Sequence, residues 1–266
     1  MRKALFLSTL LAGGMLVASP ALADDAAAAP AAPTPDFTVT GSAAVVSQYR
    51  FRGISQSDNK PVIQGAFTVT NSSGFYISTW GSSATANNAV NLGGTEIDVY
   101  GGYSKTVDGF TLDGGLYGYI YPGSAHAVGI SESYFEVYGD VSKAYGPITA
   151  KAGVNWAPDQ SYFKNWNTAT HYNVYLYGEL GFAPTNFPVS FHSHLGHTAG
   201  GFDYFTNGGV KQYFDYTVGA TYKWKALAFD LSVVGTNISK HDTSLLDRDF
   251  HRAAKSVLVG SITASF

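Results

Sequence analysis

The sequence has no cysteine, few charged residues and no long internal apolar run, and each absence excludes a class of protein. Without cysteine, the chain forms no disulfide bond and no thiolate metal site. Charged residues make up 13% of the chain, whereas a soluble domain usually carries about 25%. Beyond the extreme N-terminus no segment is apolar over about 18 residues, so a helical membrane protein is excluded.

Positive charge is also scarce, and two of the basic residues belong to an export signal. The formal net charge is −3, and no basic patch is present, so we expect no nucleic-acid partner. Arg2 and Lys3 precede an apolar stretch and the small-residue cleavage site Ala21-Leu22-Ala23, which predicts a signal peptide over residues 1–23. Its removal takes away these two positive charges and leaves −5. Residues 24–36, rich in Ala and Pro, are predicted to form a flexible periplasmic leader.

The chain is instead rich in glycine and aromatic residues, with Gly 30, Tyr 18, Phe 17 and Trp 4. From Phe37 onward, apolar residues alternate with polar or small ones, which is the period of a strand with two different faces. The pattern predicts about twelve strands, an even number as in bacterial outer-membrane barrels. Their apolar stripes lie in residues 37–49, 63–69, 75–79, 97–103, 110–120, 135–141, 148–156, 172–182, 189–195, 214–224, 227–233 and 258–266.

Alternation alone does not separate a barrel from a soluble sandwich, but the connections do. Short turns such as Asn71–Gly74 and Val107–Gly109 alternate with long loops such as Arg52–Pro61 and Ser82–Gly94. This asymmetry is typical of outer-membrane barrels, in which the turns are periplasmic and the loops face outward. We therefore predict an all-β fold over residues 37–266, an antiparallel up-and-down transmembrane β-barrel of about 12 strands in the bacterial outer membrane.

Several segments resemble one family. Ser47–Ser57, with the sequence SQYRFRGISQS, resembles the N-terminal hallmark of the TorF family of outer-membrane porins. The segments Pro61–Gly65, Ser73–Tyr76, Trp80–Ser82, Glu96–Tyr103 and Tyr117–Gly123 look like the strands that follow in that family. The resemblance is specific over roughly residues 37–140, and beyond them only the strand pattern and the terminal Phe266 carry it. It implies an outer-membrane barrel and supplies neither a solute nor catalytic residues.

The candidate functional residues are charged side chains on the inward parity. Arg50 and Arg52 are predicted to point into the lumen from the end of the first strand. Glu96 and Asp98 on the fourth strand and Glu136 on the sixth are predicted to face them from the same outer half. Such charges form a constriction that filters solutes, or salt bridges that brace the wall, or both. About twelve strands leave room for a narrow path if loops do not fill it.

Histidines and tyrosines also fall on the inward parity. His192 and His194 lie two apart on one strand and are followed by His197, a spacing that can bind a metal, but polar lumen lining is the preferred interpretation. Inward tyrosines form either a stacking track for sugars or a packed lumen, and packing is favoured. They are Tyr117, Tyr119, Tyr134, Tyr138, Tyr175 and Tyr177. We expect no cofactor and no metal.

These observations predict a porin-like channel for passive diffusion of small hydrophilic solutes, and not an enzyme. One alternative is a plugged structural or adhesive barrel that acts through its loops. Another is an outer-membrane lipid hydrolase, although no Gly-x-Ser-x-Gly elbow is present. The expected partners are outer-membrane lipid and lipopolysaccharide, small solutes and the barrel assembly machinery. The last of these would recognise the terminal aromatic Phe266.

Overall fold

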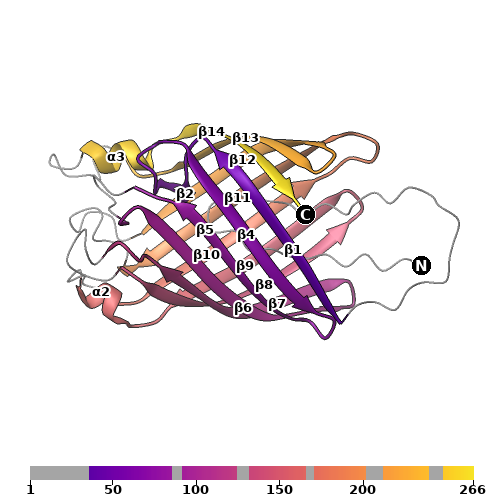
Figure 1. Cartoon of the computed structure of the whole chain (residues 1–266), viewed down its shortest axis with the longest axis horizontal. Coiled ribbons are helices and arrows are strands. Elements are labelled where there is room, and N and C mark those ends of the chain that lie inside the picture. Colours follow the sequence, from indigo (N-terminus) through magenta and orange to yellow (C-terminus); the bar gives the residue numbers. More distant parts are fainter. Residues whose placement is uncertain (1–35, 86–91, 125–131, 166–170, 202–211, 240–247) are drawn as a thin grey trace, which may run out of the picture.

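Long antiparallel strands form a closed barrel in the computed structural model, which describes residues 36–85, 92–124, 132–165, 171–201, 212–239 and 248–266 (Figure 1). In these residues twelve strands join in sequence order, and β1 closes the barrel by pairing with both β4 and β14. The prediction of an up-and-down barrel is confirmed. Its strands are β1 (Phe37–Val46), β4 (Val62–Asn71), β5 (Phe75–Ser83), β6 (Thr95–Val107), β7 (Phe110–Ile120), β8 (Tyr134–Tyr145), β9 (Ile148–Ala157), β10 (Asn173–Phe182), β11 (Val189–Gly200), β12 (Gln212–Trp224), β13 (Leu227–Thr236) and β14 (Val257–Ser265).

The two faces of the barrel wall differ as the alternation predicts. The outer face exposes large apolar side chains such as Ile63, Leu116 and Leu195, while tyrosines and carboxylates on the other parity are buried inside. Because successive side chains of a strand point to opposite faces, one face can contact an apolar environment while the other lines a polar interior. Because each of the twelve barrel strands pairs on both sides, the closed wall leaves no sheet edge exposed.

The two ends of the barrel differ in their connections. At one end, here called the turn end, short turns join the strands, as at Asp108-Gly109 between β6 and β7. Both residues have a positive φ, 51° and 78°, as a two-residue type I′ hairpin turn requires. The other end, here called the loop end, carries the long connections with α2 (Ser161–Asn165) and α3 (Arg248–Ala254) (Figure 1).

The first connection at the loop end folds back into the barrel. It contains the two-stranded hairpin β2 (Arg50–Phe51) and β3 (Ile54–Ser55), turned by Arg52 and Gly53 at φ 46° and 78°. The segment from Gln48 to Ser57, here called the plug hairpin, is almost wholly buried. The prediction that Arg50 and Arg52 belong to the end of the first strand is therefore wrong, because β1 ends at Val46.

The described helices are too short or too polar to cross a lipid bilayer.

Candidate functional site in the lumen

The loop half of the lumen is filled by the plug hairpin and the side chains around it. Tyr49 and Ser55 are 0% and 1% exposed, and Ile54 packs with Phe250 of α3. At the tip, a Cβ on Gly53 would lie 2.6 Å from Thr236 Cγ2 and 2.7 Å from the Gly235 carbonyl oxygen. The hairpin therefore needs glycine at its tip for two reasons, the left-handed φ and the close approach of β13.

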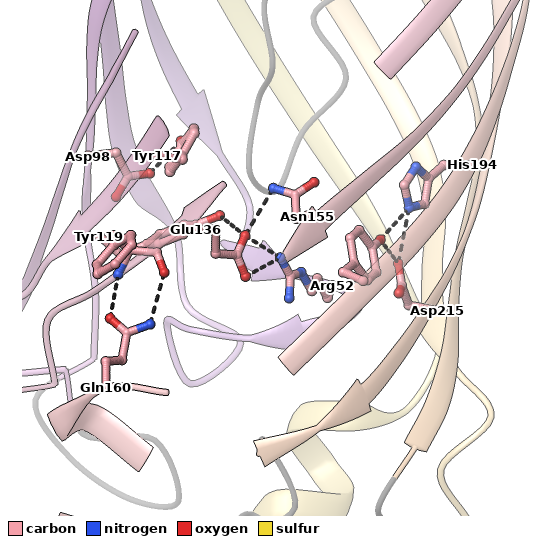
Figure 2. Close-up of polar contacts among 11 residues, drawn as sticks. Arg52, Asp98, Tyr117, Tyr119, Glu136, Asn155, Gln160, His194 and Asp215 are labelled. Atoms are coloured by element: carbon pink, nitrogen blue, oxygen red, sulfur yellow. Dashed lines mark hydrogen bonds and ion pairs between the residues drawn. The ribbon is translucent and has the colours of Figure 1, made fainter. Parts of the chain in front are cut away.

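Arg52 fastens the hairpin tip to the opposite wall. Its Nη2 donates to both carboxylate oxygens of Glu136, at 2.8 and 2.7 Å, and both side chains are buried (Figure 2). Asn155 Nδ2 and Tyr119 OH donate to Glu136 as well, at 2.9 and 3.1 Å. The guanidinium also lies over the ring of Tyr175, 4.1 Å from its centroid. A charge in this position is balanced on several sides, as a buried ion pair requires.

Arg50 has a different environment from Arg52. Its Nη1 donates to the carbonyl oxygens of Gly53, Ala253 and Lys255 at 2.7, 2.7 and 2.9 Å. Burial lowers the pKa of Arg50 to about 10, so the guanidinium stays charged at neutral pH. Arg50 therefore connects the plug hairpin to the last turn of α3 and to the residue that follows it.

Glu96 and Asp98 face inward on β6, as predicted, and are fully buried. Tyr49 OH donates to Glu96 Oε1 at 3.0 Å, and Tyr117 OH donates to Asp98 Oδ2 at 2.7 Å. Glu96 Oε2 and Asp98 Oδ1 have no hydrogen-bond partner among the described residues. Of the three predicted acids, Glu136 is the one that pairs with an arginine of the hairpin.

The inward tyrosines of the loop half pack against one another in a continuous row. The ring centroids of Tyr100 and Tyr117, then Tyr117 and Tyr119, then Tyr119 and Tyr134, lie 4.6, 4.5 and 4.5 Å apart. Tyr162 of α2 continues the row at 4.8 Å from Tyr134. Each of these rings is at most 6% exposed. The rings fill space beneath the connections and do not form an open track.

Gln160 holds the start of α2 in place over this row. Its side-chain amide accepts from Phe135 N at 2.9 Å and donates to Phe135 O at 3.0 Å, at the loop end of β8 (Figure 2). The side chain thus substitutes for a strand partner where the β8–β9 ladder has ended at Val137 and Trp156.

Glu132, in the connection between β7 and β8, was not among the predicted residues. Ser124 Oγ accepts a hydrogen bond from its backbone N–H at 3.0 Å, and its Oε2 is buried without a partner among the described residues. Burial raises the pKa of Glu132 to about 7. Its sequence position next to a predicted loop gave no sign of burial.

The turn half of the lumen has a different character, because some of its polar side chains are partly exposed. Lys151 Nζ lies 3.1 Å from Asp140 Oδ2, with the two side chains 12% and 0% exposed. His194 lies between Glu179 and Asp215, with ring nitrogens 3.3 Å from a carboxylate oxygen of each. The Glu179 and His194 side chains are 30% and 15% exposed. The region is a charged, partly exposed wall.

His192 and His194 face inward as predicted, whereas His197 contacts the outward ring of Phe214 at 4.6 Å. His192 Nε2 faces both Ser232 Oγ at 3.1 Å and Asp230 Oδ2 at 3.5 Å. A Ser-His-Asp relay needs the serine and the acid on opposite ring nitrogens, so this group does not form one. Among the described residues no group of three His, Cys, Asp or Glu side chains is arranged to hold a metal ion.

A closed barrel of twelve strands, apolar outside and polar inside, is the fold of outer-membrane porins. The family described as "Bacterial protein of unknown function (Gcw_chp)" matches residues 28–266, and the chain belongs to it. The match does not name the TorF family, so that resemblance stays a prediction. No curated protein matches the sequence.

Two solved structures share the fold at low sequence identity. One is described as "KdgM porin in complex with disordered oligogalacturonate", with 11% identity and a TM-score of 0.53 over 86% of this chain and 99% of that chain. The other is the NanC porin, with 10% identity, a TM-score of 0.53 and the same two coverages. At this identity the likeness concerns the fold alone.

Proposed function

We propose that this protein is an outer-membrane, porin-like channel for passive diffusion of small hydrophilic solutes, and that it is not an enzyme. The observation that carries the proposal is the polar, partly exposed wall of the turn half, inside a barrel whose outer face is apolar. Water and polar solutes fit such a lumen, and lipid fits the outside. The plug hairpin would make the path narrow at the loop end.

The test is single-channel recording in planar bilayers of purified protein without residues 1–23. We expect small, discrete conductance steps, together with swelling of proteoliposomes in a neutral pentose. A matched bilayer with the heat-denatured protein provides the control. If the folded protein gives no steps under several lipid and salt conditions and the vesicles do not swell, the wild-type protein is not an open channel.

One observation favours a second function, that of a plugged barrel acting through its loops. The plug hairpin is buried in the loop half, and its charge-assisted hydrogen bonds from Arg52 Nη2 to both oxygens of Glu136 hold it against β8. The two functions differ in one measurement. A plugged barrel gives no conductance until the hairpin is removed, whereas a porin conducts with the hairpin present.

The proposed location places the loop end outside the cell, and the turn end and both chain termini in the periplasm, after export by the signal peptide over residues 1–23. The leader over residues 24–36 would then lie in the periplasm. The apolar outer wall would contact membrane lipid, and the loop end lipopolysaccharide. We expect the protein in the outer-membrane fraction, with heat-modifiable migration on gels, as closed hydrogen-bonded barrels show. Recovery as a soluble periplasmic protein would contradict the location.

We also propose that Phe266 is read by the barrel assembly machinery. The terminal residue extends β14, exchanging backbone hydrogen bonds with Gly41 at 2.8 and 3.0 Å, and its ring lies over Gly41. Phe266→Asp should reduce insertion into the outer membrane while export continues, and Phe266→Tyr should insert normally. Equal insertion of the two variants would show that the terminal aromatic is not used.

A further inference from the structure

The lumen contains two neighbouring sites in which a carboxylate and a tyrosine ring together hold a cation. In the first, Glu136 on β8 pairs with Arg52, whose guanidinium lies 4.1 Å from the ring centroid of Tyr175 on β10. In the second, Asp140 on β8 pairs with Lys151, whose ammonium lies 5.9 Å from the ring centroid of Tyr177 on β10. The two sites follow each other along the same pair of strands.

The aromatic side of these sites is a built surface. The rings of Tyr175 and Tyr177 are stacked with centroids 5.8 Å apart, and His194 stacks on Tyr177 at 5.8 Å. Glycine makes room for both tyrosines, because a Cβ on Gly153 would lie 2.4 Å from the Tyr177 ring and one on Gly196 2.1 Å from Tyr175 OH. Stacked aromatic faces with adjacent carboxylates are the surroundings that favour organic cations.

The inward-facing charges of the described strands also favour cations. Two lysines on the barrel strands, Lys151 and Lys223, point inward. The inward acids on the strands outnumber them: Glu96, Asp98, Asp113, Glu136, Asp140, Glu179, Asp215 and Asp230.

Some carboxylate oxygens of the inward-facing acids lack a hydrogen-bond donor among the described residues. Asp140 Oδ1 and Asp215 Oδ2 are buried and have no hydrogen-bond partner among the described residues, although the Asp140 and Asp215 side chains are 0% and 4% exposed. The negative charge of these carboxylates would repel an anion that enters the lumen and attract a cation.

We propose that the channel selects small organic cations bearing guanidinium or ammonium groups, and that Arg52 occupies the first of its cation sites as a tethered ligand. Arg52 is carried by the plug hairpin and not by the wall, so a free cation of the same chemistry competes with it for Glu136 and Tyr175. The second site, below it, receives the solute next. The inference rests on the proposed channel function.

The experiment measures zero-current potentials, single-channel open probability and proteoliposome swelling with the mature protein. The probes are guanidinium chloride, potassium chloride, potassium gluconate and a neutral pentose. We expect guanidinium and potassium to be more permeant than chloride or gluconate, and millimolar guanidinium to raise the open probability by releasing the hairpin. The double variant Asp140→Asn/Glu179→Gln should lose the cation preference several-fold, while Asp108→Asn, which removes an exposed carboxylate from a turn, should keep it.

A second pair of variants covers the case in which the double variant does not fold. Tyr177→Phe keeps the ring and should retain the preference for guanidinium over chloride, whereas Tyr177→Leu removes the ring and should weaken that preference several-fold. If the pentose enters the vesicles but cations show no preference over anions, the inference is overturned and the channel function stands. If the wild type passes neither pentose nor ions, the channel function itself fails, and conductance of the protein without its plug hairpin would then indicate the plugged barrel.

Discussion

In the loop half of the lumen, Arg52 and Glu136 are 5% and 0% exposed, whereas in the turn half Glu179 and Asp230 are 30% and 19% exposed. Both halves are lined by tyrosines, carboxylates and a few bases, so composition does not explain the difference. The loop half is closed because one hairpin of the chain occupies it. The same chemistry therefore serves as packing where the hairpin fills the space and as a charged wall where it does not.

Removing the hairpin should make the two halves alike, and this is the largest effect we expect. Replacement of Gln48–Asp58 by a short Gly-Ser linker would leave the pairing of Val46 with Val62 intact and empty the loop half. Single-channel conductance should rise several-fold, because the narrowest part of the path is gone. A linker inserted instead at the Asp108-Gly109 turn is the control. Equal conductance of wild type and deletion would mean that the hairpin does not limit flow.

The ion pairs of the two halves should differ in their effect on stability. Arg52→Ala leaves Glu136 buried and unpaired, at a cost of about 3–5 kcal/mol in the free energy of unfolding. Lys151→Ala should cost less, about 1–3 kcal/mol, because the Lys151 side chain is 12% exposed against 5% for Arg52 and its ion pair therefore lies nearer to solvent. Denaturant unfolding followed by gel migration measures both.

The double variant Arg52→Ala/Glu136→Gln provides the control for this comparison. It removes the unpaired charge and should recover part of the loss caused by Arg52→Ala alone. Equal losses for Arg52→Ala and Lys151→Ala would remove the energetic distinction between the halves.

Gly53 and Gly109 have the same backbone φ, so alanine substitutions at the two positions distinguish the cost of backbone strain from the cost of a steric contact. Gly53 at the hairpin tip and Gly109 at the turn end both have φ of 78°, but a Cβ meets Thr236 at position 53 and nothing within 4 Å at position 109. Gly109→Ala should cost about 1 kcal/mol from strain alone. Gly53→Ala should cost more and also raise conductance, since the tip must withdraw from β13. Identical behaviour of the two variants would show that the tip contact is weak.

The smallest effect concerns pH at the loop end. The Glu132 carboxyl has a pKa of about 7 in the fold, above its ordinary value, so the folded state binds the extra proton between about pH 4.5 and 7. Stability should therefore fall slightly as pH rises through this window. Glu132→Gln should abolish that part of the slope in melting curves taken from pH 5 to 8. A slope that is unchanged in the variant would show that Glu132 is not responsible.

The strands and their faces could be predicted because lipid imposes the same rule on every strand: apolar residues on one parity. That rule placed Glu96, Asp98 and Glu136 in the lumen. The rule fails at Ser47–Phe51, where alternation continues beyond the end of β1 at Val46. It predicts that Tyr49 shares the outward face of the apolar stripe over residues 37–49, but Tyr49 is buried inside the barrel. Alternation records two faces and does not distinguish a wall strand from an inserted hairpin.

The alternation rule does not predict which side chains interact with each other inside the lumen. Parity places several acids opposite Arg52, and the choice of Glu136, 84 residues away, depends on how far the hairpin reaches. Asn155, Tyr175 and Asp215 have the predicted inward parity, but their convergence on this network needs the closed barrel. The alternation within one strand does not show which residues of distant strands face each other across the lumen.

Arg50 also bears on the order in which the barrel is completed. The ladder between β1 and β14, which closes the barrel, runs from Ser42 to Val46 on β1, and past it Arg50 reaches the carbonyls of Ala253 and Lys255, just before β14. These acceptors directly precede β14 in the chain, so the hairpin gains its hydrogen bonds to them only when β14 is in place. A chain truncated before residue 253 would lack both these hydrogen bonds of the hairpin and the pairing of β1 with β14. The folded state of the plug hairpin is therefore coupled to closure of the barrel.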